Sequence, residues 1–235
     1  MSRCRHACGS TDTFEDGLQR MQQGHGVRNE SLGYRFADGI GNAELRAQIA
    51  ARHPESILGR LVMRHSGRHH GHCCSHEAIV AEAEAWARSS RVSLPAAGVV
   101  AVHLRLDDVW RCDHLRCDAA MGGPPSLQAW AKMARRLQMF RPQCVYLVTG
   151  GHNGGADEYL NHSLRYLTEV QSTLAACGID VLLRSETPDE DLVFMLQADL
   201  FVQGRHDFSQ MIANLRRARN RTRWTHQRPY DQLTE

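Results

Sequence analysis

The sequence predicts an α/β protein built on a parallel sheet with helices on both faces. From about residue 98, short apolar runs rich in β-branched residues alternate with longer segments whose apolar residues recur at helical spacing. Turns containing glycine or proline separate the two kinds of segment. Parallel strands need a crossover between them, and a helix is the usual crossover. The alternation therefore favours a Rossmann-like parallel sheet, preceded by a short and mainly helical N-terminal part.

The composition is that of an ordinary globular protein. Of 235 residues, 42% are hydrophobic and 23% are charged, and the net charge is +2. Basic and acidic residues are interspersed, whereas nucleic-acid-binding proteins concentrate basic residues on one face. No apolar run approaches the roughly 20 residues that span a bilayer, and no apolar segment typical of a signal peptide follows the N-terminus. We therefore expect no nucleic-acid partner and no transmembrane segment.

The N-terminal part, residues 1–97, is expected to begin with irregular structure and a short helix near Phe14–Met21. The turn Asp38-Gly-Ile-Gly-Asn42 then leads into a helix-forming run over 43–51, whose N-terminus Asn42 can cap. A glycine turn before a helix also suits an anion, because free N–H groups and the helix dipole point the same way. A simple cap and an anion site are both open interpretations of Asn42.

A second N-terminal stretch, His65–His76, is dense in potential zinc ligands. The candidate ligands are His69, His70, His72, Cys73 and Cys74. Their spacing fits no paired zinc-ligand pattern, and a histidine-rich loop exposed to solvent is the alternative. A helix over 76–90 is expected to follow.

Residues 98–217 are expected to form the sheet domain, and 218–235 a polar tail. The expected strands cover 99–106, 144–149, 179–183 and 199–202. The expected helices cover 127–140 and 158–177, a short segment that starts at Thr187, and 208–217. Ser126 is placed to cap the first of these helices, and the acidic residues after Thr187 suit the dipole of the third.

Polar and charged residues follow each expected strand. These strand ends are His103–Asp108, Thr149–Asn153, Arg184–Glu186 and Gln203–Asp207. In open α/β sheets, ligands bind just outside the carboxyl ends of the strands. An arginine such as Arg105 can donate two parallel hydrogen bonds to phosphate oxygens. The pattern favours a phosphorylated or nucleotide ligand, although no P-loop motif is present. Ordinary solvated charges at the strand ends are the alternative.

Eight cysteines are too sparse for a small disulfide scaffold. Cys112 and Cys117 lie close enough in sequence to pair. Cys144 falls in an expected strand and is predicted to be a small buried hydrophobic residue.

Several motifs, taken in order, resemble those of fucosyltransferase-like glycosyltransferases. His103-Leu-Arg-Leu-Asp-Asp108 resembles their H-x-R-x-x-D element, and Asp38-Gly-Ile-Gly-Asn42 resembles their G-x-G-N turn. The run Ala198–Val202 and the Phe208-Ser209 pair resemble their last strand and the loop before the final helix. The resemblance implies a GT-B type fold, with residues 98–217 as the nucleotide-sugar-binding half and 1–97 as a partial acceptor-side domain.

The resemblance also implies a reaction. Such enzymes transfer a sugar from a nucleotide-diphosphate donor, GDP-fucose in the best-known members, to a glycan or protein acceptor. They invert the anomeric carbon and need no metal or other cofactor. Eukaryotic members work in the lumen of the Golgi or endoplasmic reticulum, and other members would be cytoplasmic.

Carried over residue by residue, the resemblance gives roles to two catalytic candidates. Arg105 would bind the pyrophosphate and stabilise the negative charge of the leaving group. Asp108 would hold Arg105 or its loop. Asp107 and Asp108 are candidates for the base that activates the acceptor, by position alone.

The remaining candidates would bind the donor. Asn42 would lie near the donor or the acceptor, and His103 would touch the nucleoside. Phe208 and Ser209 would pack on the nucleotide and donate to its phosphates at a helix N-terminus.

Two departures from the family pattern keep other functions open. Leu106 stands where the family has a second arginine, and His206-Asp207 stands where small residues approach the phosphates. The second hypothesis is therefore a catalytically silent relative that binds a nucleotide or glycan. A metal-binding protein that uses the histidine- and cysteine-rich stretch is the third hypothesis.

Overall fold

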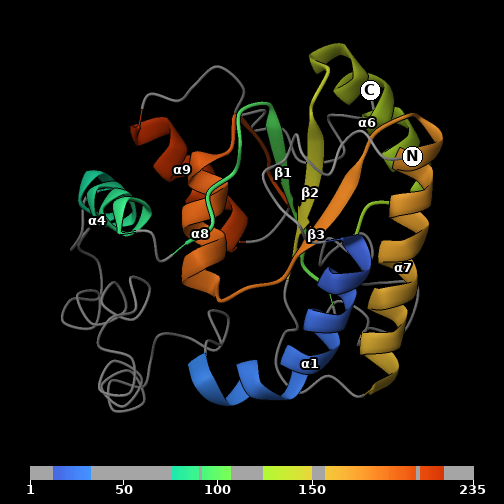
Figure 1. The fold of residues 1–235 in the computed structure, drawn as a ribbon, viewed down its shortest axis with the longest axis horizontal. Helices are drawn as coiled ribbons and strands as arrows, with labels where there is room; N and C mark the ends of the chain where they lie inside the picture. The colour runs from blue at the N-terminus through green and yellow to red at the C-terminus, as the bar shows by residue number, and fades with distance from the viewer. Residues whose placement is uncertain are drawn as a thin grey trace.

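A four-stranded parallel sheet forms the centre of the molecule (Figure 1). The computed structural model describes residues 13–32, 76–89, 92–106, 124–149, 157–204 and 207–219. Its strands are β1 (Val99–His103), β2 (Cys144–Val148), β3 (Val181–Arg184) and β4 (Leu200–Val202). They lie in the order β3-β2-β1-β4, and every neighbouring pair is parallel. The predicted α/β class is confirmed.

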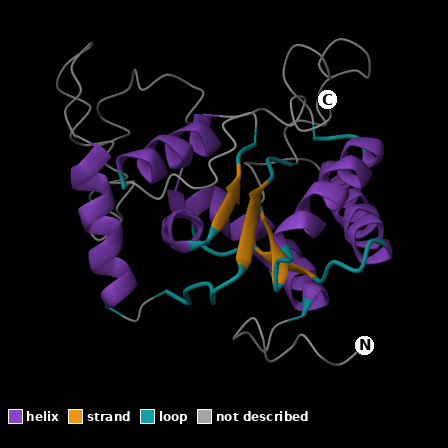
Figure 2. Cartoon of the chain, turned by 90° about the horizontal axis from the view of Figure 1, so that it is seen from above, coloured by secondary structure: helices purple, strands orange, loops and turns teal. Residues whose placement is uncertain are grey.

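Helices cover both faces of this sheet (Figure 2). One face carries α1 (Phe14–Leu32), α6 (Leu127–Phe140) and α7 (Asp157–Ala176). The other carries α4 (His76–Arg88), α8 (Pro188–Gln197) and α9 (Asp207–Ala218). None of these helices combines the length and the hydropathy that a membrane-spanning segment needs.

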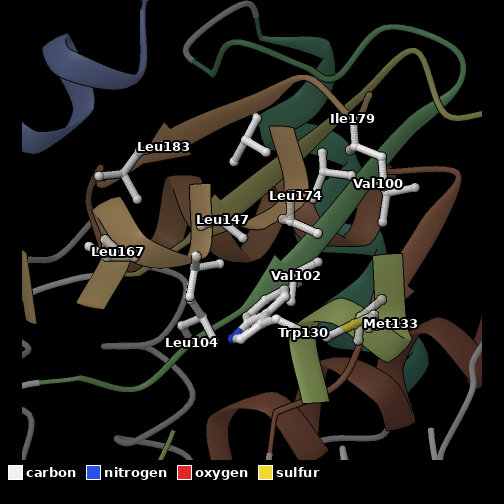
Figure 3. Close-up of a cluster of buried hydrophobic side chains, with 14 of the residues drawn as sticks. Val100, Val102, Leu104, Trp130, Met133, Leu147, Leu167, Leu174, Ile179 and Leu183 are labelled. Carbon is white, nitrogen blue, oxygen red and sulfur yellow. The ribbon is translucent and has the colours of Figure 1, made fainter. Parts of the chain in front are cut away.

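Two hydrophobic cores lie between the sheet and its helices. On β1, Val100 and Val102 belong to the core under α6 and α7, whereas Val99 and Ala101 belong to the core under α8 and α9. Figure 3 shows Trp130 of α6 beside Val102 and Leu104 in the first of these cores. Both faces of every strand are covered, which is why the strands appear in the sequence as continuous apolar runs rather than alternating ones.

Helix α1 is longer than the sequence predicted. It runs to Leu32 rather than ending near Met21, and the stretch beyond Gln23 has few apolar residues to reveal it. Its first half packs along the outer strand β3, where Phe14 and Met21 are buried. Arg20 forms an ion pair of 3.2 Å with Glu186, just beyond the end of β3. Helix α1 therefore runs in the same direction as β3, toward the carboxyl edge of the sheet.

The described helices of residues 1–97 pack into the hydrophobic cores of the sheet. Phe14 and Met21 of α1 lie in one core of the sheet, and Ile79 and Ala83 of α4 lie in the other. The described portions of residues 1–97 therefore share their hydrophobic cores with residues 98–217.

The predicted cap of α6 is present, and α8 carries a capping box where the sequence predicted only a helix start with acidic residues. The Ser126 hydroxyl accepts a hydrogen bond of 3.2 Å from the Ala129 N–H at the start of α6. Thr187 and Glu190 form a capping box at the start of α8, each side chain bonded to the backbone N–H of the other. These caps fix where the two helices begin.

The interpretation of Cys144 needs a correction. Cys144 is buried, as predicted, but it takes part in a disulfide. Its burial in a strand resembled that of a small hydrophobic residue, and spacing alone does not reveal disulfide partners. Cys177, at the end of α7, is a free thiol. Cys112 and Cys117 lie outside the described residues.

Tyr166 gives the fold a sensitivity to alkaline pH. Its hydroxyl accepts from the Trp130 indole N–H and donates to the Pro125 carbonyl, both at 2.6 Å. Burial raises the pKa of Tyr166 well above its usual range, and the hydrogen bond from Trp130 lowers it only partly. The unfolded tyrosine ionises near pH 10 while the folded one stays neutral. Raising the pH past about 10 therefore favours the unfolded state.

We expect the free energy of unfolding of the wild type to fall from pH 9 to pH 11 more steeply than that of Tyr166→Phe. The variant starts from lower stability at pH 8, because phenylalanine loses both hydrogen bonds, but it has no phenol at 166 to ionise. Urea denaturation at each pH measures the difference. Tyr159→Phe, on the same helix, is the control and should keep the wild-type slope. An equally steep fall in Tyr166→Phe would contradict this role.

Candidate functional site

The candidate site lies at the carboxyl edge of the sheet, between β1 and β4. Of the residues predicted for it, His103, Arg105, Phe208 and Ser209 belong to the described chain. Asn42, Asp107 and Asp108 lie outside the described residues, and so do the histidines and cysteines at 69–74.

Residues far apart in the sequence meet at this edge. We call them the edge cluster: His103, Gln203, Gly204, Phe208 and Ser209. Val102 of β1 is paired with Val202 of β4, so the residues that follow these two positions emerge side by side. Helix α9 begins at Asp207, and this brings Phe208 and Ser209 back over the strand ends.

His103 and Phe208 form the aromatic part of the edge cluster. Their ring centroids lie 5.4 Å apart, with an interplanar angle of 63°, which is an edge-to-face contact. The His103 side chain is buried, whereas Phe208 is half-buried. The structure thus joins two residues that the sequence had placed in one site from motifs about a hundred positions apart.

Gly204 and Ser209 hold the loop after β4. The Gly204 N–H donates a hydrogen bond of 2.6 Å to the Ser209 hydroxyl oxygen, and Ser209 is completely buried. A Cβ at Gly204 would lie 2.8 Å from the carbonyl oxygen of His103. Only glycine therefore fits between the end of β1 and the first turn of α9. The hydrogen bond from Gly204 to Ser209 holds the loop in place, and the sequence did not reveal this bond.

Replacing Gly204 with alanine should push the loop away from His103. We expect the free energy of unfolding to fall by about 1–3 kcal/mol, the usual cost of overpacking. Chemical denaturation measures the effect. Gly178→Ala is the comparison, because a Cβ there meets nothing within 4 Å and its loss of stability reports only the backbone strain at a φ of 73°, not overpacking. Equal stability in Gly204→Ala and wild type would contradict the close approach.

Arg105 lies two residues beyond His103 and is half-buried. The Leu104 N–H still donates to the Val148 carbonyl at 2.9 Å, so β1 and β2 stay paired up to this point. Leu104 and Leu106, on either side of Arg105, are both buried in the core below α6 and α7. These two leucines anchor the backbone that carries Arg105 at the edge of the sheet.

A buried ion pair closes the edge at β3. The Arg184 guanidinium contacts an Asp191 carboxylate oxygen at 2.9 Å, and its central carbon lies 4.4 Å from the ring centroid of Phe194. The Thr149 N–H donates to the Arg184 carbonyl at 3.0 Å, which ties β2 to β3 beyond the paired strands. Sequence reasoning placed Arg184 at a strand end but did not identify its partner, because the register of α8 against β3 is a tertiary property.

The Thr149 hydroxyl oxygen and the Gln203 side-chain carbonyl oxygen are buried at this edge and have no hydrogen-bond partner among the described residues. Thr149 directly follows β2 and Gln203 directly follows β4, the two strands that flank β1. Native proteins leave few such atoms unsatisfied, and those that remain often mark a site for water, an ion or a ligand.

The arrangement suits an anionic ligand with a planar group. The first turn of α9 presents backbone N–H groups and the positive end of the helix dipole. Arg105 adds a cation, and the half-buried Phe208 ring, which contacts the buried His103 ring, adds a planar surface. Within the described part of the chain, no group of histidine, cysteine, aspartate or glutamate side chains is placed to hold a metal ion.

The sequence matches no protein-family model, and no curated protein matches it.

Proposed function

We propose that the chain is a fucosyltransferase-like glycosyltransferase of the GT-B type. It would transfer a sugar from a nucleotide-diphosphate donor, GDP-fucose in the first instance, to a glycan or protein acceptor. The reaction would invert the anomeric carbon and require no metal.

One observation carries this proposal. The motif around His103 and the motif around Phe208, which suggested the family separately, meet in the edge cluster at a ring distance of 5.4 Å. They meet at the carboxyl edge of a parallel sheet, where nucleotides bind in folds of this kind. A chance resemblance at either motif would not require the two to be neighbours in space.

The proposed chemistry uses the residues of this edge. The acceptor hydroxyl oxygen forms a bond to the anomeric carbon while the bond from that carbon to the diphosphate oxygen breaks. Arg105 stabilises the negative charge that develops on the departing nucleoside diphosphate. The acceptor's proton passes to a carboxylate, for which Asp107 and Asp108 are candidates. His103 and Phe208 hold the nucleoside.

Arg105→Ala tests the proposal. We expect the wild type to bind GDP in isothermal titration calorimetry, and Arg105→Ala to bind it about 10- to 100-fold more weakly, because a charge-assisted phosphate contact is lost. Arg135→Ala, an exposed arginine on α6, is the matched control and should bind as the wild type does. Equal affinity in Arg105→Ala and wild type would remove Arg105 from the site.

A catalytically silent, nucleotide-binding relative is the second candidate. Leu106, where the resemblance places a second arginine, is completely buried in the hydrophobic core. A leucine carries no charge, and this one is enclosed in the core, so position 106 supplies no cation for the phosphates of the donor. Stoichiometric GDP binding without release of GDP from GDP-fucose, across a panel of glycan and glycoprotein acceptors, would favour this candidate over the enzyme.

The disulfide at Cys144 supports a compartment for the proposed activity. Disulfides persist in oxidising environments such as the secretory lumen and are rare in the cytosol. We therefore place the proposed activity in that lumen. Mass spectrometry of protein that is denatured and then alkylated without reduction should find Cys144 unmodified and Cys177 alkylated, and an alkylated Cys144 would withdraw this support.

A further inference from the structure

Gln203 lies beside His103 in the edge cluster. Its side chain and that of His103 both face α9, because Gln203 contacts Gln210 and His103 contacts Phe208. Gln203 is 6% exposed, and its carbonyl oxygen has no hydrogen-bond partner among the described residues. A buried carbonyl oxygen that has lost its water is costly unless something donates to it.

A chain of side-chain amides connects Gln203 to the surface. The Gln203 amide nitrogen donates to the Gln210 carbonyl oxygen at 2.8 Å. The Gln210 amide nitrogen donates to the Asn214 carbonyl oxygen at 2.9 Å. The Arg217 guanidinium donates to the same oxygen of Asn214. Gln210, Asn214 and Arg217 all belong to α9, at spacings that place them along one side of the helix.

Arg217 sets the direction of this chain. The oxygen and nitrogen of an amide have nearly the same shape, so the hydrogen-bond network decides which way each amide faces. A guanidinium can only donate, which requires Asn214 to present its oxygen. Gln210 must then present nitrogen to Asn214 and oxygen to Gln203. Gln203 in turn gives its nitrogen to Gln210, and its oxygen is the atom left over.

We propose that Gln203 is a specificity-determining residue, whose side-chain carbonyl accepts a hydrogen bond from an N–H or O–H group of the bound nucleotide sugar, and that Arg217 is the positioning residue that orients it. This inference rests on the proposed function, since it names what the same site selects. The selected chemistry is a hydrogen-bond donor, carried either by the nucleobase or by the transferred sugar.

The first test compares wild type with Gln203→Leu, using GDP and GDP-fucose as probes in calorimetry. We expect one neutral hydrogen bond to be lost, which weakens binding about 3- to 10-fold. Weaker binding of both probes places the donor group on the nucleoside. Weaker binding of GDP-fucose alone places it on the sugar. Unchanged dissociation constants for both probes would overturn the proposal.

The second test changes only the surface end of the chain. In Arg217→Glu the carboxylate can only accept, so Asn214 must turn its nitrogen outward and each amide behind it reverses. Gln203 then offers nitrogen instead of oxygen, and binding should weaken as in Gln203→Leu. Arg217→Lys still donates and should keep the orientation. Arg135→Glu on α6 controls for the reversed charge.

Equal affinities in Arg217→Glu and Arg217→Lys would refute the positioning role even if Gln203→Leu failed to fold. A wild type that binds neither probe would refute the proposed function, and the inference with it. A wild type that binds both probes, with no change in Gln203→Leu and in Arg217→Glu, would refute the inference alone.

Discussion

Replacing Arg216 with alanine should lower the free energy of unfolding by about 3–5 kcal/mol, the range for removing one member of a buried, hydrogen-bonded polar network. Arg216 of α9 is completely buried. One of its terminal nitrogens donates to the main-chain carbonyls of Met195 and Ala198, each at 2.7 Å, and the other donates to that of Asp199 at 3.2 Å. Helix ends leave such carbonyls without intrahelical partners. Arg216 therefore closes the C-terminus of α8 and joins it to α9.

Urea denaturation of Arg216→Ala, with Arg135→Ala as an exposed arginine control, measures this effect. Arg216→Lys tests the geometry, because a lysine keeps the charge but cannot reach the same carbonyls in a fork. We expect the lysine variant to recover only part of the loss. A loss below about 1 kcal/mol in Arg216→Ala, near the worth of a single ordinary hydrogen bond, would show that the carbonyls find other partners.

Replacing Gly17 with valine should detach α1 from β3. A Cβ at Gly17 would lie 2.3 Å from the carbonyl oxygen of Leu183 and 2.6 Å from its Cβ. The helix cannot accept a side chain there without moving away from β3 and exposing Phe14 and Met21, which are 3% and 1% exposed. Overpacking and lost burial together should cost about 3 kcal/mol or more.

Gln19→Val is the matched control for Gly17→Val, because it places the same side chain on an exposed position of the same helix. Thermal unfolding of the two variants separates a helix-propensity effect from the steric effect. The side of β3 away from β2 has no neighbouring strand in the described sheet, so we also expect Gly17→Val to aggregate more readily. Equal melting temperatures in the two variants would contradict the close packing of α1.

The strands and most helices could be predicted because each carries a local signal. The apolar run at Val99 and the caps at Ser126 and Thr187 depend on residues within one element. The extent of α1 could not be predicted, because the stretch beyond Gln23 has few apolar residues to mark it as a helix. The disulfide of Cys144 likewise could not be predicted, because spacing in the sequence does not reveal which cysteines pair.

The residues of the candidate site also divide into those marked by a local motif and those whose surroundings depend on tertiary contacts. His103, Arg105, Phe208 and Ser209 could be named as candidates because they belong to short motifs, and the sheet brings them to one edge. The roles given to Asn42 and Asp108 stay predictions, since both residues lie outside the described chain. The sequence marked Gln203 only as the first residue of a polar strand end, because its proposed role depends on the orientation of three amides and on the loss of solvent around one oxygen atom.

Hydrogen–deuterium exchange with and without GDP tests the central claim most directly, namely that the carboxyl edge between β1 and β4 binds the nucleotide. We predict slower exchange in peptides that cover 99–106 and 203–212, no change in peptides from α6, and loss of the protection in Arg105→Ala. Protection confined to other segments, or no protection at saturating GDP, would contradict the assignment of this edge as the nucleotide site.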